Sequence, residues 1–355
     1  MRALSLLLAL LCLTSCATKK TGGTELDRFE FTRDEMGMPF KIVLFAKTQV
    51  EGETAATAAF DRIHQLNGIL SDYDADSELS LLSRTSGSRK PVPVSPDLWQ
   101  VLEFSLLQSE RTGGAFDVTV GPVVNLWRKA RRDKKLPDEA RLAEARQRVG
   151  YDKIHLNSKA KTVQLEVPEM RLDFGGIAKG YALGEALKTL ESLKITRALV
   201  SAGGDMVAGD APPRRRGWRV ELPPLDAANA PASRFVLIQN CALATSGDLY
   251  QRLEIDGKRY SHIVNPRTGI GLTDHSLVVV IAPTGMLADT LSTALSVLGP
   301  QKGLDLIERL PATETRIVRQ PGVKVEIYES PGFRDFFEDA IQPSEPLIPM
   351  TPLVR

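Results

Sequence analysis

Segments with the periodicity of strands and of helices alternate irregularly along this chain. Hairpin-like pairs of strands lie between the helices. This pattern favours one mixed α/β (α+β) domain with mixed sheets and flanking helices over a doubly wound parallel sheet. Strands are predicted at 40–46, 153–157, 162–167, 197–202, 217–222, 235–239, 276–282 and 323–328, and helices at 54–70, 96–111, 137–149, 179–193, 286–298 and 301–310.

The charge balance limits the class of ligand. The chain has 45 Lys or Arg and 44 Asp or Glu, a net charge of +1, whereas a protein that grips nucleic acid would carry a basic excess. Apolar residues make up 43% of the chain, which excludes wholesale disorder. Three cysteines are too few for a disulfide framework. We therefore expect a soluble globular body and no nucleic-acid partner.

The N-terminus has the features of a targeting signal. Arg2 precedes a short apolar run, and Leu13-Thr14-Ser15-Cys16 resembles the lipobox of bacterial lipoproteins. We expect a signal peptide at 1–15, a lipidated tether at 16–27 that begins at Cys16, one domain at 28–340 and a Pro-rich tail at 341–355. The protein would then lie outside the cytoplasm, anchored to the bacterial membrane by lipid. The alternative is an ordinary secretory signal cleaved nearby.

Three short segments combine glycine with aspartate at expected strand ends. Residues 171–180 (RLDFGGIAKG) lead from an expected strand into a helix, and a Gly-Gly pair at a helix entrance allows the backbone to approach an anion. Residues 201–205 (SAGGD) and 244–248 (ATSGD) are the other two. Each alone could be an ordinary turn, but the three together indicate a ligand site.

Two further segments carry side chains suited to catalysis or metal binding. His262 lies among turn residues in 260–269 (YSHIVNPRTG), although a lone histidine is usually structural. Asp289 and Thr293 are four residues apart near the start of an expected helix, so their oxygens share one face. Such hard oxygen ligands suit Mg²⁺. The alternative is that Asp289 merely caps the helix or interacts with its dipole.

Taken together, these segments resemble the ApbE family of flavin transferases. The family patterns D-x-G-G-I-A-K-G, G-G-D, A-T-S-G-x-Y, S-H-I-x-D-P-x-T-G and D-A-x-x-T-A occur here in the same order, approximately, at 173–180, 203–205, 244–250, 261–269 and 289–294. The resemblance covers about residues 30 to 330 and implies a flavin-transferase-type domain. It also implies transfer of FMN from FAD to a Thr or Ser hydroxyl of an acceptor flavoprotein, with a membrane redox subunit expected as that partner, and release of AMP.

The resemblance also implies a set of site residues. Asp289, Thr293 and the carbonyl of Gly176 would hold Mg²⁺, and His262 would be the base for the acceptor hydroxyl. The FAD site would be lined by Met36, Tyr73, Ala115, Phe116, Asp117, Asp173, Lys179 and Ile263. Without the family, Tyr73 would be a half-buried loop residue, and Asp117 and Lys179 would be ion-paired or solvated.

Two other functions stay open at this point. Water could replace the acceptor hydroxyl, so that FAD is hydrolysed to FMN and AMP, or the chain could bind flavin without catalysis. The basic runs at 127–135 and 214–216 could contact anionic lipid, but solvated loops are the simpler interpretation.

Overall fold

The structure is a computed structural model, and it describes residues 25–226, 230, 232–248 and 252–338. The predicted signal peptide, Cys16, most of the tether and the Pro-rich tail lie outside these residues. The strands are β1 (Asp27–Glu35), β2 (Met38–Ala46), β3 (Val92–Pro93), β4 (Ile154–Asn157), β5 (Thr162–Leu165), β6 (Ala198–Ala202), β7 (Asp205–Ala208), β8 (Trp218–Leu222), β9 (Arg234–Ile238), β10 (Cys241–Gly247), β11 (Arg252–Ile255), β12 (Lys258–Ser261), β13 (His275–Ala282), β14 (Glu314–Gln320) and β15 (Glu326–Glu329). The helices are α1 (Gln49–Leu70), α2 (Glu78–Arg84), α3 (Pro96–Arg111), α4 (Gly121–Asp133), α5 (Glu139–Gln147), α6 (Ala178–Ser192), α7 (Gly285–Leu298) and α8 (Pro300–Ile307), with 3₁₀ turns η1 (Val118–Val120), η2 (Tyr151–Lys153) and η3 (Pro331–Phe336).

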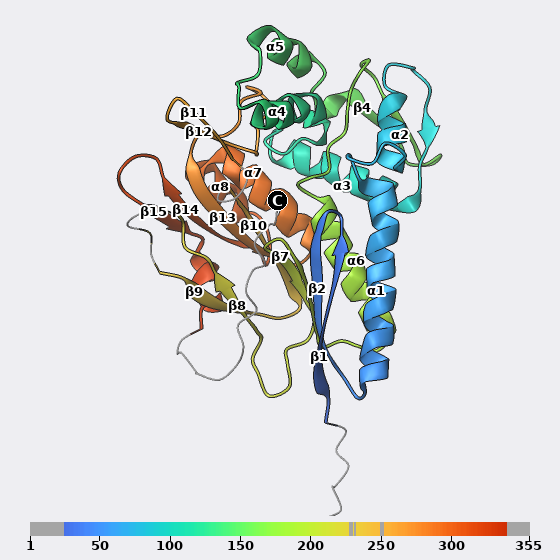
Figure 1. Cartoon of the computed structure of the whole chain (residues 1–355), viewed down its shortest axis with the longest axis vertical. Helices are drawn as coiled ribbons and strands as arrows, with labels where there is room; N and C mark the ends of the chain where they lie inside the picture. Colours follow the sequence, from blue (N-terminus) through green and yellow to red (C-terminus); the bar gives the residue numbers. More distant parts are fainter. Residues whose placement is uncertain (1–24, 227–229, 231, 249–251, 339–355) are drawn as a thin grey trace, which may run out of the picture.

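One large sheet organises the molecule (Figure 1). Its eight strands have the order β1-β2-β6-β7-β10-β13-β14-β15, and each pairing between described strands is antiparallel. The prediction of a mixed α/β domain with flanking helices is confirmed. The prediction of mixed sheets is wrong for the described strands, because all their pairings are antiparallel.

Alternation along the strands gives the sheet two buried faces. In β2, Ile42 and Leu44 join the core formed with α1, α6 and α7, whereas Val43 joins the core on the opposite face. That opposite face is covered by the β8–β9 hairpin and by η3. Because successive side chains point to opposite faces, the continuous apolar run predicted at 40–46 becomes the centre of a three-layer structure.

A smaller core holds α4 and α5 against the β11–β12 hairpin. Val123, Trp127 and Ala130 lie on one stripe of α4, at the spacing of a buried helix face. The indole Nε1 of Trp127 donates to the carbonyl of Gly269 at 2.7 Å. The interpretation of 127–135 as a solvated loop is therefore wrong up to Asp133, because the basic run hid this stripe.

The elements predicted from sequence are present, with ends shifted by a few residues, but several others were missed. Residues 244–248 were expected to form a loop, yet residues 244–247 lie inside β10. Similarly, 171–174 are irregular rather than a strand, although a turn at 175–177 does lead into α6. The missed elements are β1, β3, β7, β10, β11, β12, β14, α2 and α4.

Candidate active site

Two hairpin turns lie side by side at the same end of the strands of the large sheet. Phe40 near the start of β2 pairs with Ala202 at the end of β6, so the turn at Met36 and Gly37 lies at the same edge as the turn at 203–204. Gly203 and Gly204 both have positive φ, which favours glycine in this tight turn. The second turn delivers Asp205, the first residue of β7, to this edge.

The helices α6 and α7 cross at a pair of glycines. A side-chain carbon built on Gly180 would collide with the carbonyl oxygen of Gly285, and the reverse is also true. The two backbones therefore touch, which only glycine permits. This contact brings Asp289, one turn further along α7, against α6, where its Oδ2 accepts a hydrogen bond of 2.9 Å from the amide of Gly180.

A lysine joins two buried carboxylates at this crossing. The ammonium of Lys179 forms an ion pair with Asp205 and lies 3.7 Å from Oδ1 of Asp289. Asp205 also accepts a hydrogen bond of 3.0 Å from the amide of Thr245 in β10. Burial disfavours the charged lysine, but the two carboxylates more than offset it and raise the pKa of Lys179. Lys179 is therefore ion-paired, as one alternative had it.

The three predicted metal ligands also meet here. A side-chain carbon on Gly176 would lie 2.8 Å from Thr293 Oγ1, so the turn at 175–176 packs directly against α7. Thr293 follows Asp289 by one turn on the same helix. Burial, opposed by Lys179 and reinforced by Asp205, raises the pKa of Asp289 to about 6.

Asp289 does not cap its helix. The N-cap of α7 is Thr284, whose Oγ1 accepts from the amide of Leu287 at 3.3 Å. The capping interpretation is therefore wrong: the carboxylate instead accepts from the amide of Gly180 and faces the ammonium of Lys179. Across the described parts of the chain, no three His, Cys, Asp or Glu side chains form a metal-binding group. A cation here would thus share one carboxylate with hydroxyl, carbonyl and substrate oxygens, which is the donor set that Mg²⁺ accepts.

An exposed aromatic ring lies beside a second charged cluster. Tyr73 is 79% exposed, and the guanidinium carbon of Arg128 lies 4.2 Å from its ring centroid. Arg128 also pairs with Asp173 at 2.9 Å and with Asp72. Burial, together with the nearby Asp72 carboxylate, raises the pKa of Asp173 to about 6 despite Arg128. The half-buried interpretation of Tyr73 is wrong, because Arg128 holds the ring as an exposed platform suited to stacking.

The segment at 115–117 is buried and supports the site from behind. The ring of Phe116 would lie 3.3 Å from a side-chain carbon on Gly176, and Ala115 is buried beside it in sequence. Asp117 is neither ion-paired nor solvated, contrary to both alternatives. Its carboxylate caps η1 through the amide of Thr119 at 2.8 Å and accepts from the amide of Tyr151 at 3.0 Å.

His262 and Ile263 follow β12 directly. Ser261 is buried, and its Oγ accepts from the amide of Ile263 at 3.1 Å, which fixes the turn that presents the histidine. His262 is half-buried and Ile263 is buried. Asn265 then organises the next turn by accepting from the amides of Arg267 and Thr268.

Sequence reasoning missed three residues that build the site. Asp205 was seen in the Gly-Gly-Asp segment but not assigned, although its position directly after a Gly-Gly turn was a signal. Thr245 acts through its main-chain amide, which the sequence does not distinguish. Arg128 was hidden in the basic run, and its one signal was its place beside Trp127 at the edge of the apolar stripe.

The fold and the site define a mixed α/β protein whose sheet edge gathers an ammonium, two buried carboxylates and a glycine turn. The family model described as "ApbE family" matches residues 36–317. The chain is 34% identical over 267 residues to FAD:protein FMN transferase of Haemophilus influenzae, an alignment that covers 71% of this chain and 77% of that protein. It is 32% identical to the protein of the same name from Klebsiella pneumoniae, with 85% and 87% covered.

Solved structures give the same assignment. The structure of the flavin transferase ApbE from Vibrio cholerae superposes with a TM-score of 0.79 at 28% identity, over 88% of this chain and 99% of that one. The chain therefore belongs to the ApbE family.

Proposed function

We propose that this protein transfers FMN from FAD to a threonine or serine hydroxyl of an acceptor flavoprotein and releases AMP. One observation carries the proposal: the turn at Gly176 packs against Thr293 of α7, and Asp289, one turn earlier on the same helix, lies beside Lys179. A diphosphate gains negative charge on its oxygens as it is cleaved, and this cluster offers the positive charge and oxygen ligands that such a group needs. The names of the Haemophilus and Klebsiella relatives support the same activity.

The metal ligands would be Asp289, Thr293 and the carbonyl of Gly176, and we propose Mg²⁺ as the ion. When bound, the ion neutralises charge on the diphosphate oxygens. Lys179, kept protonated by its two carboxylates, would bind a phosphate oxygen. Asp205 would hold the ammonium at the sheet edge while Asp289 serves the cation.

The flavin half of FAD would stack on the free face of Tyr73, whose other face Arg128 covers. The buried segment at 115–117 and the turn at Met36 would form walls of the FAD site. The FAD-contacting set is the one expected from the family, with Asp117 supporting the wall through its hydrogen bonds: Met36, Tyr73, Ala115, Phe116, Asp117, Asp173, Lys179 and Ile263.

His262 would act as the general base. It accepts the proton of the acceptor hydroxyl as that oxygen forms a bond to the phosphorus of FMN. The bond from this phosphorus to the bridging oxygen breaks, and AMP leaves with that oxygen. An imidazole suits the step because its ordinary pKa is close to neutral pH.

We also propose that the mature protein is anchored through Cys16 and works outside the cytoplasm, on the basis of the lipobox-like segment. Within the described residues, the helices are too short or too polar to cross a bilayer. Labelling cells with an alkyne-bearing fatty acid tests the anchor: wild type should carry the label and Cys16→Ser should not.

The activity is tested with purified protein, FAD, Mg²⁺ and a threonine-bearing acceptor domain. A covalently fluorescent acceptor and one AMP for each flavin attached are the expected products. Free FMN with AMP would indicate hydrolysis instead, and unchanged FAD would indicate a binding protein. Either of these outcomes would overturn the proposed transfer.

A further inference from the structure

One end of the molecule carries a concentration of positive charge. Residues 121–153, which form α4, α5 and the turn into β4, contain ten Lys or Arg and five Asp or Glu, whereas the whole chain has a net charge of only +1. Some of this charge is used internally. Arg128 serves Asp72 and Asp173, and Arg148 pairs with Glu144 and Glu169. The exposed remainder includes Lys129, Arg132, Lys134, Lys135, Arg141 and Arg146.

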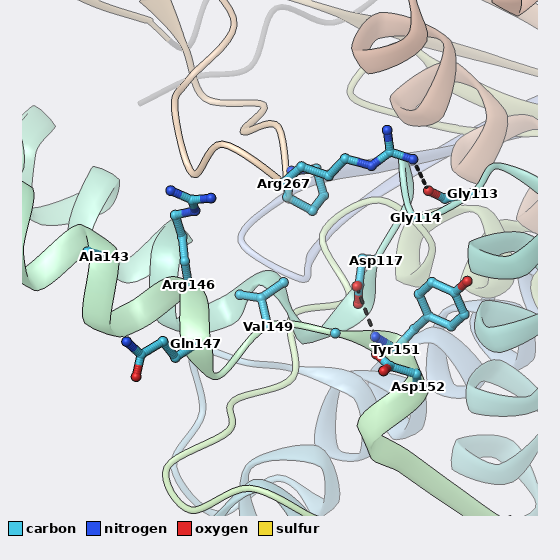
Figure 2. A pocket seen from close by; sticks show the side chains of 12 residues that line it. Gly113, Gly114, Asp117, Ala143, Arg146, Gln147, Val149, Tyr151, Asp152 and Arg267 are labelled. Atoms are coloured by element: carbon cyan, nitrogen blue, oxygen red, sulfur yellow. Dashed lines mark hydrogen bonds between the residues drawn. The ribbon is translucent and has the colours of Figure 1, made fainter.

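A hollow of about 580 Å³ opens at this end. It lies between α5, the turn at 150–152, the turn at 113–114 and the turn at 266–267. Figure 2 shows Arg146 rising from α5 toward the turn that carries Arg267. Both side chains are exposed, and no carboxylate of the described residues forms an ion pair with either.

The two arginines contact two different turns. Arg267 donates to the carbonyl of Gly113 at 2.6 Å, and a side-chain carbon on Gly269 would lie 2.9 Å from Cδ of Arg146. The buried acid that lines the hollow, Asp117, already accepts hydrogen bonds from the amide of Thr119 and, as Figure 2 shows, from the amide of Tyr151. The hollow thus presents the guanidinium groups of Arg146 and Arg267 to solvent, and Asp152 is the one exposed acid among its lining residues.

The hollow adjoins both halves of the proposed reaction. Its turn at 113–114 runs into Ala115 and Phe116, which wall the proposed FAD site. Its turn at 266–267 follows His262, the proposed base, by a few residues. A polypeptide seated in the hollow would therefore lie beside the place where the acceptor hydroxyl must enter.

The position of this end in the molecule favours a protein over a lipid surface. The first strand, β1, begins at the opposite end of the long axis from α5 (Figure 1). A membrane anchor that precedes β1 would join the folded body at the end farthest from α5. Anionic headgroups are then the less suitable partner, although their charge would also match.

From these observations we infer that the hollow bounded by Arg146 and Arg267 is the docking surface for the acceptor protein, and that it binds an acidic segment next to the flavinylated residue. This inference rests on the proposed function. Opposite charges at such a surface speed encounter and select the partner, more than they add to final affinity. The attraction weakens as salt increases, because the pairs are exposed.

The test uses the full mature chain and two labelled peptides, each with one Thr flanked by four Glu or by four Lys on either side. Fluorescence anisotropy at low salt should show that wild type binds the Glu peptide at least tenfold more tightly than the Lys peptide. The Arg146→Glu/Arg267→Glu variant should lose about tenfold in affinity for the Glu peptide. The matched control, Lys302→Glu/Lys324→Glu, makes the same change in net charge at exposed positions outside the hollow and should keep wild-type affinity.

Equal binding of the Glu peptide by both double variants would overturn the docking surface. Loss of binding to phosphatidylglycerol vesicles in the arginine variant alone, with peptide binding unchanged, would assign the surface to lipid and also overturn it. The neutral pair Arg146→Gln/Arg267→Gln should give a smaller loss in the same direction, which guards against misfolding of the charge reversal. Quenching of FAD fluorescence is measured in parallel. A wild-type protein that binds no FAD would refute the proposed function itself, whereas one that binds FAD normally while the peptide tests fail would refute only the docking surface.

Discussion

The amide of Gly180 donates a hydrogen bond of 2.9 Å to the carboxylate of Asp289, across the point where α6 and α7 touch. A main-chain group of one helix thus fixes the orientation of a charged side chain on another. This geometry holds one carboxylate oxygen and leaves the other directed toward Lys179. The packing of two glycines therefore determines where the proposed metal ligand lies.

Gly285→Ala should lower both stability and activity, because the added methyl group has no space against α6. Overpacking of this kind costs about 1–3 kcal/mol in the free energy of unfolding. The control is Gly184→Ala, in the same α6 helix, where nothing lies within 4 Å of the added carbon. That control should be neutral or stabilising by up to about 1 kcal/mol. Urea denaturation measures both, and equal effects would contradict the crossing.

Asp289→Ala should abolish metal-dependent turnover while the fold persists. It removes the single carboxylate of the proposed ligand set, and the Asp205 carboxylate still pairs with Lys179. Asp305→Ala, at an exposed position of α8, is the matched control and should keep full activity. Release of AMP at varied Mg²⁺ concentration is the measurement. Metal-stimulated turnover in the Asp289 variant would remove this residue from the metal site.

Metal affinity should fall as the pH drops below about 6, because the pKa of Asp289 is raised to about 6 and only the ionised form binds a cation. The expected slope approaches tenfold per pH unit, measured by calorimetric titration with Mg²⁺. The effect on apo-protein stability has the opposite sign. A carboxyl with a raised folded pKa stabilises most below its unfolded pKa of about 3.9, and that contribution is lost as the pH rises through about 6. A flat metal affinity from pH 5 to 7.5 would contradict this assignment.

Tyr73→Ala should weaken FAD binding by about tenfold, since stacking of a ring system on an aromatic side chain contributes about 1–3 kcal/mol. Tyr73→Phe keeps the ring and should bind FAD as wild type does. The ring is exposed, so neither change should alter the melting temperature. Fluorescence titration of FAD decides the matter: equal affinity in both variants would exclude stacking.

His262→Ala should slow transfer about a hundredfold or more while the dissociation constant for FAD changes little, because general-base catalysis typically contributes about 10²–10⁴-fold. His155→Ala is the control, since His155 is exposed and pairs with Glu166 away from the proposed base. The comparison needs single-turnover rates and FAD affinities for both variants. A loss of FAD affinity with an unchanged rate would make His262 a binding residue.

The sequence predicted the positions of site residues correctly where local spacing alone determines which side chains lie together. The Asp289–Thr293 spacing placed two oxygens on one helix face, and the Gly175–Gly176 turn had to approach something closely; the structure brings these features together. The register of the antiparallel strands was not predictable, because it follows from long-range pairing. For that reason Asp205 and the amide of Thr245 went unassigned. Arg128 was missed because charge dominates the local pattern while its burial comes from tertiary packing.

The pairing of Phe40 with Ala202 ties the chemistry of this protein to the alignment of its central strands. A slip of one residue between β2 and β6 would turn Ile42 toward the β8–β9 hairpin and Val43 toward the helices on the opposite face of the sheet. It would also shift the neighbouring turn by about 3.3 Å, the rise of one strand residue, and carry Asp205 away from its lysine. Chains with misaligned strands should consequently be inactive and poorly soluble. Correct strand pairing during folding is therefore a condition for activity in this enzyme.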